Sequence, residues 1–490
     1  MHTSINRMVS VIALLLTLSA SCLHAQTWGA LGTGLGLNSQ FGVASVHALQ
    51  VVSGDLYAGG SFAAPGGNYG IARWNGSSWN SVGGGANASV LALAALNGVV
   101  YAGGDLTSVG GVSVNRIAKW NGTSWSALGT GMNGFVYALA AKGTKVYVGG
   151  SFTTAGGVTV NRIAYWETTD STWHAMGSGL DNDVFAIAIT DNDTVYAGGQ
   201  FSNLLRKWNP GTSSWDALAN GPSGGTTPVI RALAAKGNHL YVGGKFTTVG
   251  SPAITVRGIA KWSGSAWSGL TTQPWVSDGT VRAIAWNGPF QMCATGYLPE
   301  NPDTSSTRDQ IYLLENGDSG TWSTTAMTSG LYRQFYSGEY GRALAVSSSG
   351  DKVYVGGFFD SAGGVSGTLN VAVWNVPTTV NIVGYYPAWE EGTWGNFVLT
   401  RTGSTASVLD VSYSASGDAT PELDYNDTPY GEWGGNATFP AGYSQLDVII
   451  VGVEDLEVEG TESIVLSLTP SASYTIGSPS SGSIYLYDND

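Results

Sequence analysis

The sequence predicts an all-β protein: a seven-bladed β-propeller followed by an immunoglobulin-like Greek-key β-sandwich. Three observations support this prediction: a repeat of roughly 40–55 residues, a glycine content of 71 in 490 residues, and a change in charge near residue 376. Each repeat holds four short runs of apolar or alternating residues, bounded by Gly, Ser, Thr or Asn clusters, which is typical of four strands. Four strands in a repeat of this length indicate a propeller blade.

The second and third strands of the repeat carry its most regular motifs. An aromatic residue, then Ala or Val, then two glycines mark the second strand at Tyr57, Tyr101, Tyr147, Tyr196, Tyr241 and Tyr354, with a degraded copy at residues 292–296. The third strand ends at Trp74, Trp120, Trp166, Trp208, Trp262 and Trp374, with Leu314 in the degraded copy. We interpret the Gly-Gly pairs as turns of the blades rather than as phosphate-binding loops, because almost no helical sequence follows them.

The fourth strand begins at a second tryptophan in each repeat: Trp28, Trp79, Trp125, Trp173, Trp215, Trp267 and Trp322. Turns such as Asn75-Gly76 and Asn121-Gly122 precede it. Asn-Gly tolerates positive φ at both positions, as a tight hairpin turn requires. We therefore expect left-handed backbone at both residues of these turns.

The two ends of the repeat region predict how the ring closes. Trp28 begins a fourth strand without three predecessors, whereas the last repeat stops at Trp374 without a fourth strand. We expect the N-terminal strand to pair with the final blade, which would remove the exposed edge of an open array. An open stack of β-repeats is the alternative.

The first 25 residues have the features of a signal peptide. Arg7 precedes an apolar run at residues 9–20, and Ala25 ends a plausible cleavage site. That run is too short to span a bilayer. We therefore expect a signal peptide at residues 1–25, a propeller closed by the N-terminal strand at 26–375 and a sandwich at 376–490, in a protein that is secreted or displayed at the cell surface and has no transmembrane segment.

Charge divides the chain into two different parts. Residues 26–375 contain 18 acidic and 18 basic residues, whereas residues 376–490 contain 16 acidic residues and Arg401, a net charge of −15. The lack of a basic patch argues against nucleic acid as a partner. The acidic part favours cations.

Seven alternating runs in the acidic part predict the strands of the sandwich. They lie at residues 380–383, 396–400, 408–413, 437–439, 446–451, 463–468 and 483–487. Acidic residues gather at strand ends; Asp455 and Asp488, for example, each follow an apolar strand. A hard cation with about six to eight oxygen ligands would relieve the repulsion among carboxylates at one end of the sandwich. An acidic rim that is only solvated is the alternative.

Residues 378–490 resemble a Calx-beta domain. The resemblance rests on Glu390, on the run FVLTRTG at 397–403, on VGVED at 451–455 and on the final YDND at 487–490. It implies calcium as a cofactor, with ligands at Glu390, Asp424, Glu454, Asp455, Glu459, Glu462, Asp488 and Asp490. The chain departs from the family at Glu454 and Asn489, where aspartates are usual, which implies fewer ions or weaker binding.

The propeller part resembles kelch and galactose-oxidase-like propellers, and also the repeats of fungal cortical cell-polarity markers and bacterial surface proteins. These resemblances carry no active site onto the chain. Galactose oxidase uses paired His, Tyr and a modified Cys for copper, whereas here the part after residue 25 has three histidines in separate repeats and Cys293 alone. No nucleophile elbow, zinc spacing or phosphate loop is present, so we expect no catalytic residues and no enzyme.

One position of the first strand predicts a ligand surface. The residue before Ala-Leu or Ala-Ile is, in chain order, His47, Leu91, Tyr137, Phe185, Arg231, Arg282 and Arg342. Guanidinium groups suit carboxylate or sulfate, and aromatic rings suit sugar faces. We expect Arg231, Arg282, Arg342, Tyr137 and Phe185 to bind an acidic glycan near the channel mouth. The alternative is that these positions bind nothing.

These observations together favour a secreted or cell-surface binding or adhesion protein, with a protein or glycan ligand and a calcium-stiffened sandwich. A propeller enzyme acting on glycans, such as a glycosidase or lyase, and a purely structural matrix protein are the alternatives. The sequence does not indicate the oligomeric state.

Overall fold

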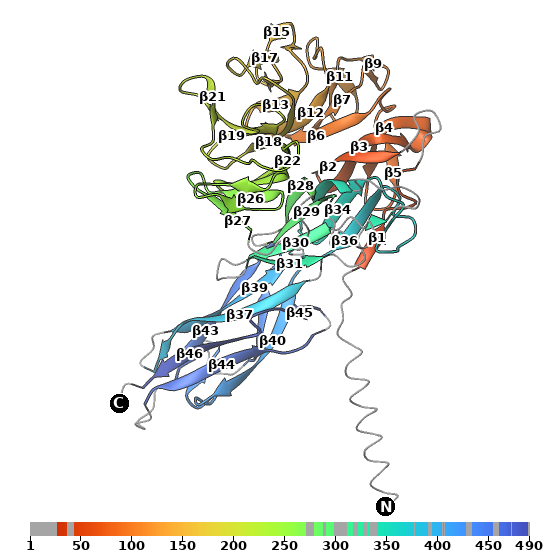
Figure 1. Ribbon diagram of the computed structural model, residues 1–490. Coiled ribbons are helices and arrows are strands. Elements are labelled where there is room, and N and C mark those ends of the chain that lie inside the picture. Colours follow the sequence, from red (N-terminus) through yellow and green to blue (C-terminus); the bar gives the residue numbers. More distant parts are fainter. Residues whose placement is uncertain are drawn as a thin grey trace, which may run out of the picture. The chain divides into compact units, whose positions relative to one another are not determined.

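A computed structural model describes most of the chain between residues 27 and 488 (Figure 1). The described residues are 27–36, 44–270, 279–287, 291–297, 311–316, 322–326, 331–332, 341–376, 378–390, 394–403, 405, 407–427, 434–453, 460–471 and 473–488. The signal peptide expected at residues 1–25 lies outside them. No α-helix occurs among the described residues, which confirms the all-β prediction.

The chain divides into two compact units. The N-terminal unit comprises Thr27–Ser348 and Val353–Trp374, and the C-terminal unit includes Asn375–Asp490. Each unit is described by itself below.

Four-stranded antiparallel sheets build the N-terminal unit (Figure 1). Within the described residues there are seven of them: β2 (Ser45–Val52), β3 (Asp55–Ala64), β4 (Asn68–Trp74) and β5 (Trp79–Ser81); β6 (Val90–Leu96), β7 (Val99–Gly104), β10 (Ile117–Trp120) and β11 (Trp125–Ala127); β12 (Val136–Lys142), β13 (Lys145–Gly150), β16 (Ile163–Glu167) and β17 (Thr172–Ala175); β18 (Val184–Ile189), β19 (Val195–Gly199), β20 (Leu205–Asn209) and β21 (Ser214–Ala217); β22 (Val229–Lys236), β23 (His239–Lys245), β26 (Ile259–Trp262) and β27 (Trp267–Gly269); β28 (Thr280–Asn287), β29 (Gln291–Tyr297), β30 (Ile311–Asn316) and β31 (Trp322–Ala326); and β33 (Gly341–Val346), β34 (Lys352–Gly357), β36 (Val371–Asn375) and β1 (Thr27–Ala30).

Short elements lie in the connections of these sheets. They are η1 (Pro65–Gly67) and the two-stranded ribbons β8 (Ser108–Val109) with β9 (Val112–Ser113), β14 (Thr154–Ala155) with β15 (Val158–Thr159), β24 (Thr248–Val249) with β25 (Ile254–Thr255), and β32 (Leu331–Tyr332) with β35 (Ser361–Ala362).

The first strands of the seven sheets contact one another in a closed cycle. Their order is β2, β6, β12, β18, β22, β28 and β33, and β33 contacts β2. The sheet that contains β33 takes its fourth strand from the other end of the unit, since β1 pairs with β36. Trp28 and Trp374, on these two strands, lie edge to face with ring centroids 5.2 Å apart.

Five of the fourth-strand tryptophans each have two partners. The ring packs against the third-strand tryptophan of the same sheet, as with Trp120 and Trp125 at 5.4 Å between centroids. The indole N–H donates to a backbone carbonyl of the preceding sheet, and Trp125 reaches Val82 O at 2.9 Å. Trp79, Trp173, Trp215 and Trp267 donate in the same way. Because a buried N–H must find an acceptor, this repeated residue ties each sheet to its neighbour.

The Gly-Gly pairs of the second-strand motif lie inside the second strands, so their interpretation as turns is wrong, whereas Gly110-Gly111 and Gly156-Gly157 do lie in turns. A Cβ on Gly59 would lie 2.7 Å from Val90 Cγ1 of the next sheet, and one on Gly60 would lie 2.1 Å from Ser45 O of its own sheet. The first glycine therefore admits the neighbouring sheet and the second admits the first strand. A Cβ on Gly356 would lie 2.4 Å from Val46 Cγ1, where the last sheet meets the first.

The turns between third and fourth strands also differ from the prediction. Gly76 and Gly122 have positive φ of 96° and 98°, but Asn75 and Asn121 do not. Asn75 Oδ1 instead accepts hydrogen bonds from the backbone N–H groups of Ser77 and Ser78. The asparagine closes the loop through its side chain, as in an Asx turn.

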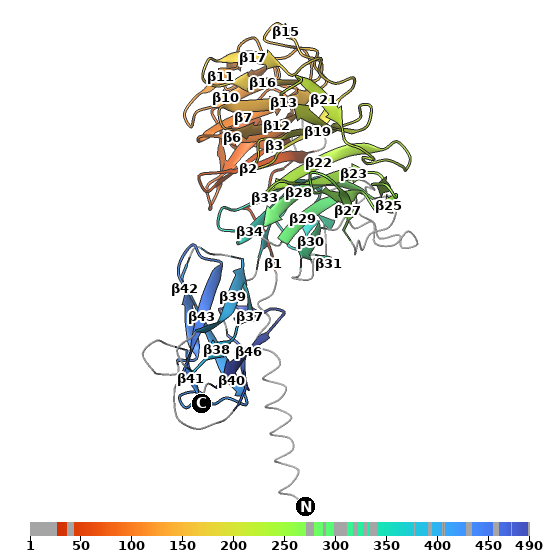
Figure 2. The same ribbon diagram turned by 90° about the vertical axis from the view of Figure 1, so that its left-hand side faces the viewer.

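Two five-stranded sheets pack together in the C-terminal unit (Figure 2). One has the order β41 (Tyr425–Asn426), β43 (Gln445–Gly452), β39 (Gly395–Thr402), β37 (Thr379–Tyr386) and β45 (Thr475–Ile476). The other has the order β38 (Ala388–Trp389), β46 (Ser481–Tyr487), β44 (Glu462–Leu468), β40 (Leu409–Gly417) and β42 (Asn436–Phe439). The core between them includes the fully buried side chains of Phe397, Phe439, Ile450 and Ile464.

Arg401, the one basic residue at 376–490, lies within this unit rather than on its surface. It is buried and donates to the backbone carbonyls of Tyr443, Ser407, Thr405 and Pro440. Its charge is satisfied by carbonyl dipoles. The exposed side chains of residues 376–490 are therefore acidic or uncharged.

Candidate functional site

Every first strand of the seven sheets contains a β-bulge at the same position. In β2 the register shifts between Val46 and Ala48, and the other six strands shift at the equivalent residues. The residues at the shift are His47, Leu91, Tyr137, Phe185, Arg231, Arg282 and Arg342. A bulge leaves its extra residue unpaired and re-aims the side chain. The seven positions, which we call the bulge ring, are thus equivalent in backbone geometry as well as in sequence.

Aromatic and cationic side chains form a continuous stack along one part of the bulge ring. The rings of Tyr137 and Phe185 lie 5.3 Å apart, and the guanidinium carbon of Arg231 lies 4.2 Å from the centre of the Phe185 ring. Phe135 continues the stack beyond Tyr137 at 6.0 Å, and Arg116 lies over Phe135 at 5.3 Å. Distances of this size are those of cation–π contacts. The structure therefore places Arg231 against Phe185, which in turn contacts Tyr137, the other aromatic residue predicted to bind with it.

The basic part of the bulge ring is organised around His47. Arg342 Nη1 lies 3.1 Å from His47 Nδ1, and His47 Nε2 lies 3.3 Å from Ser61 Oγ. Burial, and then the positive charges of Arg342 and Arg282, lower the pKa of His47 to about 3. The imidazole is therefore neutral at physiological pH, accepts from Arg342 at Nδ1 and donates from Nε2–H to Ser61.

This arrangement suits binding an anion more than acid–base chemistry. The half-buried guanidinium groups of Arg231, Arg282 and Arg342 supply donors in fixed planes. None of the seven positions carries a carboxylate or a hydroxyl nucleophile other than the Tyr137 phenol. A pKa near 3 also makes His47 a poor general base at neutral pH.

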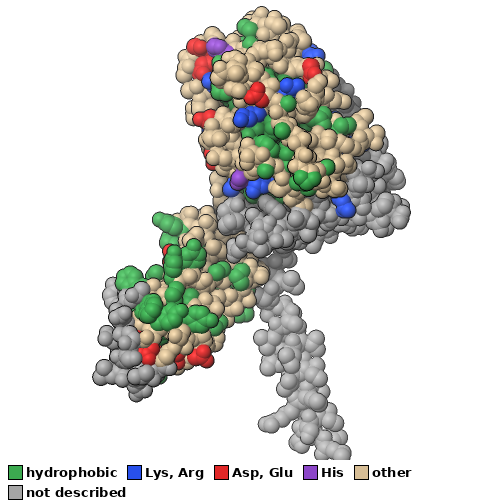
Figure 3. Space-filling view, turned by 60° about the vertical axis from the view of Figure 1, so that its left-hand side comes forward, with side chains coloured by type: hydrophobic (Ala, Val, Ile, Leu, Met, Phe, Trp, Pro, Cys, Tyr) green, Lys and Arg blue, Asp and Glu red, His purple; other side chains and the backbone are tan. Residues whose placement is uncertain are grey.

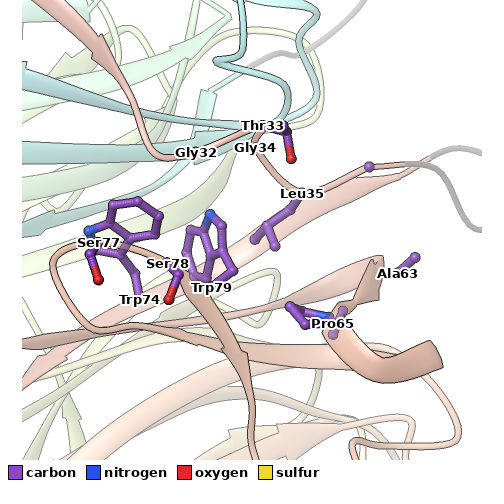
Figure 4. Close-up of a pocket in the computed structure, with 12 residues that line it drawn as sticks. Gly32, Thr33, Gly34, Leu35, Ala63, Pro65, Trp74, Ser77, Ser78 and Trp79 are labelled. Atoms are coloured by element: carbon purple, nitrogen blue, oxygen red, sulfur yellow. The ribbon is translucent and has the colours of Figure 1, made fainter.

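A cavity of about 500 Å³ lies between the segment 32–36, which follows β1, and the ends of β3, β4 and β5 (Figure 4). Its walls are the glycine-rich segment 32–36, Pro65 and the Trp74–Trp79 pair. Its lining residues include no titratable side chain, and Trp79 already donates to Leu31 O there. We therefore assign the cavity to sheet packing.

Strand pairing gathers acidic residues at one end of the C-terminal unit. Glu462 begins β44 opposite Leu486, and Ala388 flanks the same Leu486 from β38. The backbone N–H of Glu390 donates to Tyr487 O, which places Glu390 beside Asp488. Side chains alternate along a strand, so these three acids share the inward-facing register of Ala388, Ile464 and Leu486.

Two further residues lie at this end. The carbonyl of Asp424 accepts from Val453 N at 2.8 Å, next to the segment 454–459, and its side chain accepts from Thr420 N. The side chain of Asn426, two residues on, is buried, and its amide oxygen accepts no hydrogen bond within the described residues. Amide oxygens are calcium ligands, and neither the charge pattern nor the family resemblance pointed to Asn426.

Part of the residue set predicted to bind calcium lies at one end of the C-terminal unit, and calcium binding itself stays a prediction. Glu390, Asp424, Glu462 and Asp488 lie at the same end, whereas Glu454, Asp455, Glu459 and Asp490 are outside the described residues. Among the described residues no three acidic, histidine or cysteine side chains are close enough together to hold a metal. Asp488 Oδ2 accepts from Gly460 N at 3.0 Å.

Cys293 is a packing residue rather than a reactive thiol. It is fully buried, and burial raises the pKa of its thiol to about 12. Among the residues that the structure describes, no helix is long and apolar enough to cross a membrane.

Comparison with known proteins supports the architecture of the N-terminal unit. Residues 127–286 match a family model described as the Rax2 C-terminal beta propeller domain. The N-terminal unit is therefore of the β-propeller class; the kelch resemblance finds no such support.

Two solved structures are similar to the chain in part. The first is the extracellular domain of the hybrid two-component system BT4673 from B. thetaiotaomicron, at 10% identity and a TM-score of 0.46; the match covers 77% of this chain and 46% of that one. The second is the apo form of the Calx CBD1 domain, at 22% identity and a TM-score of 0.20, covering 23% of this chain and 99% of that one. The chain thus spans less than half the length of the first structure. No curated protein matches it.

Proposed function

We propose that this protein is a secreted or cell-surface binding protein whose bulge ring takes an acidic glycan or a similar anionic ligand. Its scaffold is a seven-bladed propeller closed by the N-terminal strand, at residues 26–375. Its second domain, 376–490, is an immunoglobulin-like sandwich of Calx-beta type that binds calcium. The signal-like segment at residues 1–25 supports export.

The observation that carries the proposal is the shared bulge in all seven first strands. It presents three arginines in succession, with His47 neutral beside Arg342 and Phe185 stacked under Arg231. Planar guanidinium groups pair with carboxylate or sulfate, and the aromatic stack fits the apolar face of a sugar. A propeller glycosidase would need paired carboxylates, and no position of the bulge ring supplies one, which favours binding over catalysis.

A glycan array probed with the purified chain tests this proposal. The triple variant Arg231→Gln, Arg282→Gln and Arg342→Gln is expected to lose binding to carboxylated and sulfated glycans. A matched control changes Lys119, Lys207 and Lys261 to Gln, which removes the same charge from third strands. Binding that survives in the arginine variant, or is lost equally in the lysine variant, rejects the site. A wild-type chain that binds nothing favours the structural matrix protein.

Calcium at the acidic end of the C-terminal unit is the second part of the proposal. The position of Glu390, Glu462 and Asp488 at one end of adjacent strands supports it. Because no three acidic side chains of the described residues are close enough together to hold an ion, the ion would need further ligands from the predicted set Glu454, Asp455, Glu459 and Asp490. Ligands that belong to several strands and loops would be tied together by the ion, so binding free energy would add to folding free energy. The sandwich would then serve as a calcium-stiffened spacer.

A further inference from the structure

We infer that the outward face of the sheet β38-β46-β44-β40-β42 is a second binding surface, which takes a neutral polysaccharide. We call the part formed by Trp389, Tyr485 and Tyr487 the aromatic platform. Figure 3 shows hydrophobic side chains gathered on one face of the C-terminal unit. The large hydrophobic side chains exposed in this unit include Tyr385, Tyr386, Trp389, Trp394 and Tyr485.

Strand register builds the aromatic platform. Trp389 pairs with Tyr487 across β38 and β46, and their rings lie 4.4 Å apart. Tyr485 stands two residues earlier on the same side of β46, with its ring 6.4 Å from that of Tyr487 and 58% of the residue exposed. Ile484 and Leu486 alternate with them into the core. The three rings are therefore held in a row by the sheet rather than by a mobile loop.

Hydroxyl groups continue this face away from the aromatic platform. Ser463 lies opposite Tyr485, Val465 opposite Ser483, and Ser467 opposite Ser481. On the next strand Ser416 pairs with Val465 and Ser414 with Ser467. Ser414, Ser416, Ser481 and Ser483 are exposed. The face thus combines aromatic rings with several serine hydroxyl groups.

Charge decides which partner fits. Residues 376–490 carry a net charge of −15, and their one basic side chain, Arg401, is buried. An acidic polymer or anionic membrane finds no cation here and is repelled. A second copy of the chain brings the same negative charge and is repelled as well. A basic partner finds serine, valine and aromatic side chains around the aromatic platform, and the two carboxylates on and directly after β40 are already engaged: Asp418 accepts from Ser463 and Asp410 accepts from Thr438.

A neutral polysaccharide meets each of these conditions. Its sugar rings have apolar faces that stack on Trp and Tyr, and its hydroxyls exchange hydrogen bonds with serine, which both donates and accepts. It carries no charge that the acidic unit would oppose. An extended chain also suits a flat sheet face, because successive sugars repeat the same contacts.

Affinity electrophoresis of the full chain tests this surface. Native gels contain hydroxyethyl cellulose, mixed-linkage β-glucan or galactomannan, with dextran sulfate as the acidic polymer. We expect at least one neutral polymer to retard the protein. The double variant Tyr485→Ala and Tyr487→Ala is expected to weaken that retardation about tenfold or more, as loss of two stacking rings implies. Tyr443→Ala, an exposed tyrosine before β43, is the matched control and is expected to behave as wild type.

Further variants separate a lost site from a lost fold. Tyr485→Phe with Tyr487→Phe keeps the rings and is expected to keep binding. The triple arginine variant of the bulge ring is also expected to keep it, so the two sites fail independently. No retardation by any neutral polymer, equal retardation of the double alanine variant, or self-association that only the alanine variant loses would each overturn the inference.

Discussion

Replacing Gly356 by alanine probes the joint at which the last sheet of the N-terminal unit meets the first. The new Cβ would lie 2.4 Å from Val46 Cγ1 and 3.0 Å from Val46 Cβ. Carbon atoms pack best at about 3.5–4.0 Å, so β2 and β34 must move apart or Val46 must leave its rotamer. Overpacking of this kind costs about 1–3 kcal/mol. The lower entropy of the unfolded alanine chain offsets about 0.4–1 kcal/mol, which leaves a net loss of about 1–2 kcal/mol.

Gly103→Ala is the matched comparison. Its Cβ would lie 2.4 Å from Val136 Cγ1, the same contact between two sheets that follow one another along the chain. Urea unfolding of both variants, read by tryptophan fluorescence, gives the two free-energy losses. A closed ring predicts losses that agree within about 0.5 kcal/mol. Adding Val46→Ala to Gly356→Ala is expected to cost less than the sum of the two single changes.

An open arrangement predicts a different result. Gly103→Ala would still destabilise the protein, whereas Gly356→Ala would leave the free energy of unfolding at its wild-type value or raise it. That pattern would refute the reasoning, because the contact with Val46 exists only if the ring is closed.

Three other outcomes are expected. Calcium at 100 times its Kd is expected to stabilise the protein by about 2.7 kcal/mol and so to raise its melting temperature. Calorimetry is expected to show that Glu390→Gln with Glu462→Gln removes this stabilisation, whereas Asp410→Asn on β40 keeps it. The absence of any heat of calcium binding in the wild type would contradict the site. The folded-state pKa of His47 is about 3, below the ordinary value of 6.5. Between these two values the unfolded chain binds a proton that the folded chain does not, so this residue's contribution to stability is lost as pH falls from about 6.5 to 3. NMR of the His47 ring is expected to show no titration near pH 6.5, and a titration midpoint near 6.5 would contradict its buried environment. Trp125→Phe leaves the buried Val82 carbonyl without its indole donor and is expected to cost about 1–3 kcal/mol in urea unfolding, and a neutral change would show that the hydrogen bond does not hold the sheets together.

Repetition explains why strand positions could be read from the sequence. The third-strand tryptophans mark the ends of β4, β10 and β26, and the fourth-strand tryptophans begin β5, β11 and β27. Each pair meets across one antiparallel register, such as Trp74 with Trp79. A motif copied in successive repeats reveals its role because only positions with a common contact keep the same residue.

Packing between sheets could not be read in the same way. A Gly-Gly pair is as typical of a turn as of a crowded strand, and what decides is the contact of Gly59 with Val90, some thirty residues on. The bulge at His47 is likewise a property of the pairing between β2 and β3. The bulge-ring residues were still found from sequence because they occupy one fixed place before Ala-Leu or Ala-Ile.

In the C-terminal unit, too, the contacts that depend on strand pairing could not be predicted from the sequence. Charge and spacing located Glu390, Glu462 and Asp488 near strand ends, but their common inward register depends on the pairing of β38, β46 and β44. The aromatic platform was missed because Trp389 and Tyr487 lie far apart in the chain and meet through a parallel pairing. Exposed aromatic residues that no repeat copies leave no periodic signal.

The most direct test of the bulge ring follows the His47 side chain by NMR during titration with a sulfated oligosaccharide. An anion bound to Arg342 and Arg282 would offset the charges that lower the pKa of His47, so its ring resonances are expected to move with the binding curve and its pKa to rise. Binding that leaves the His47 resonances unchanged, or the absence of any binding, would contradict the account.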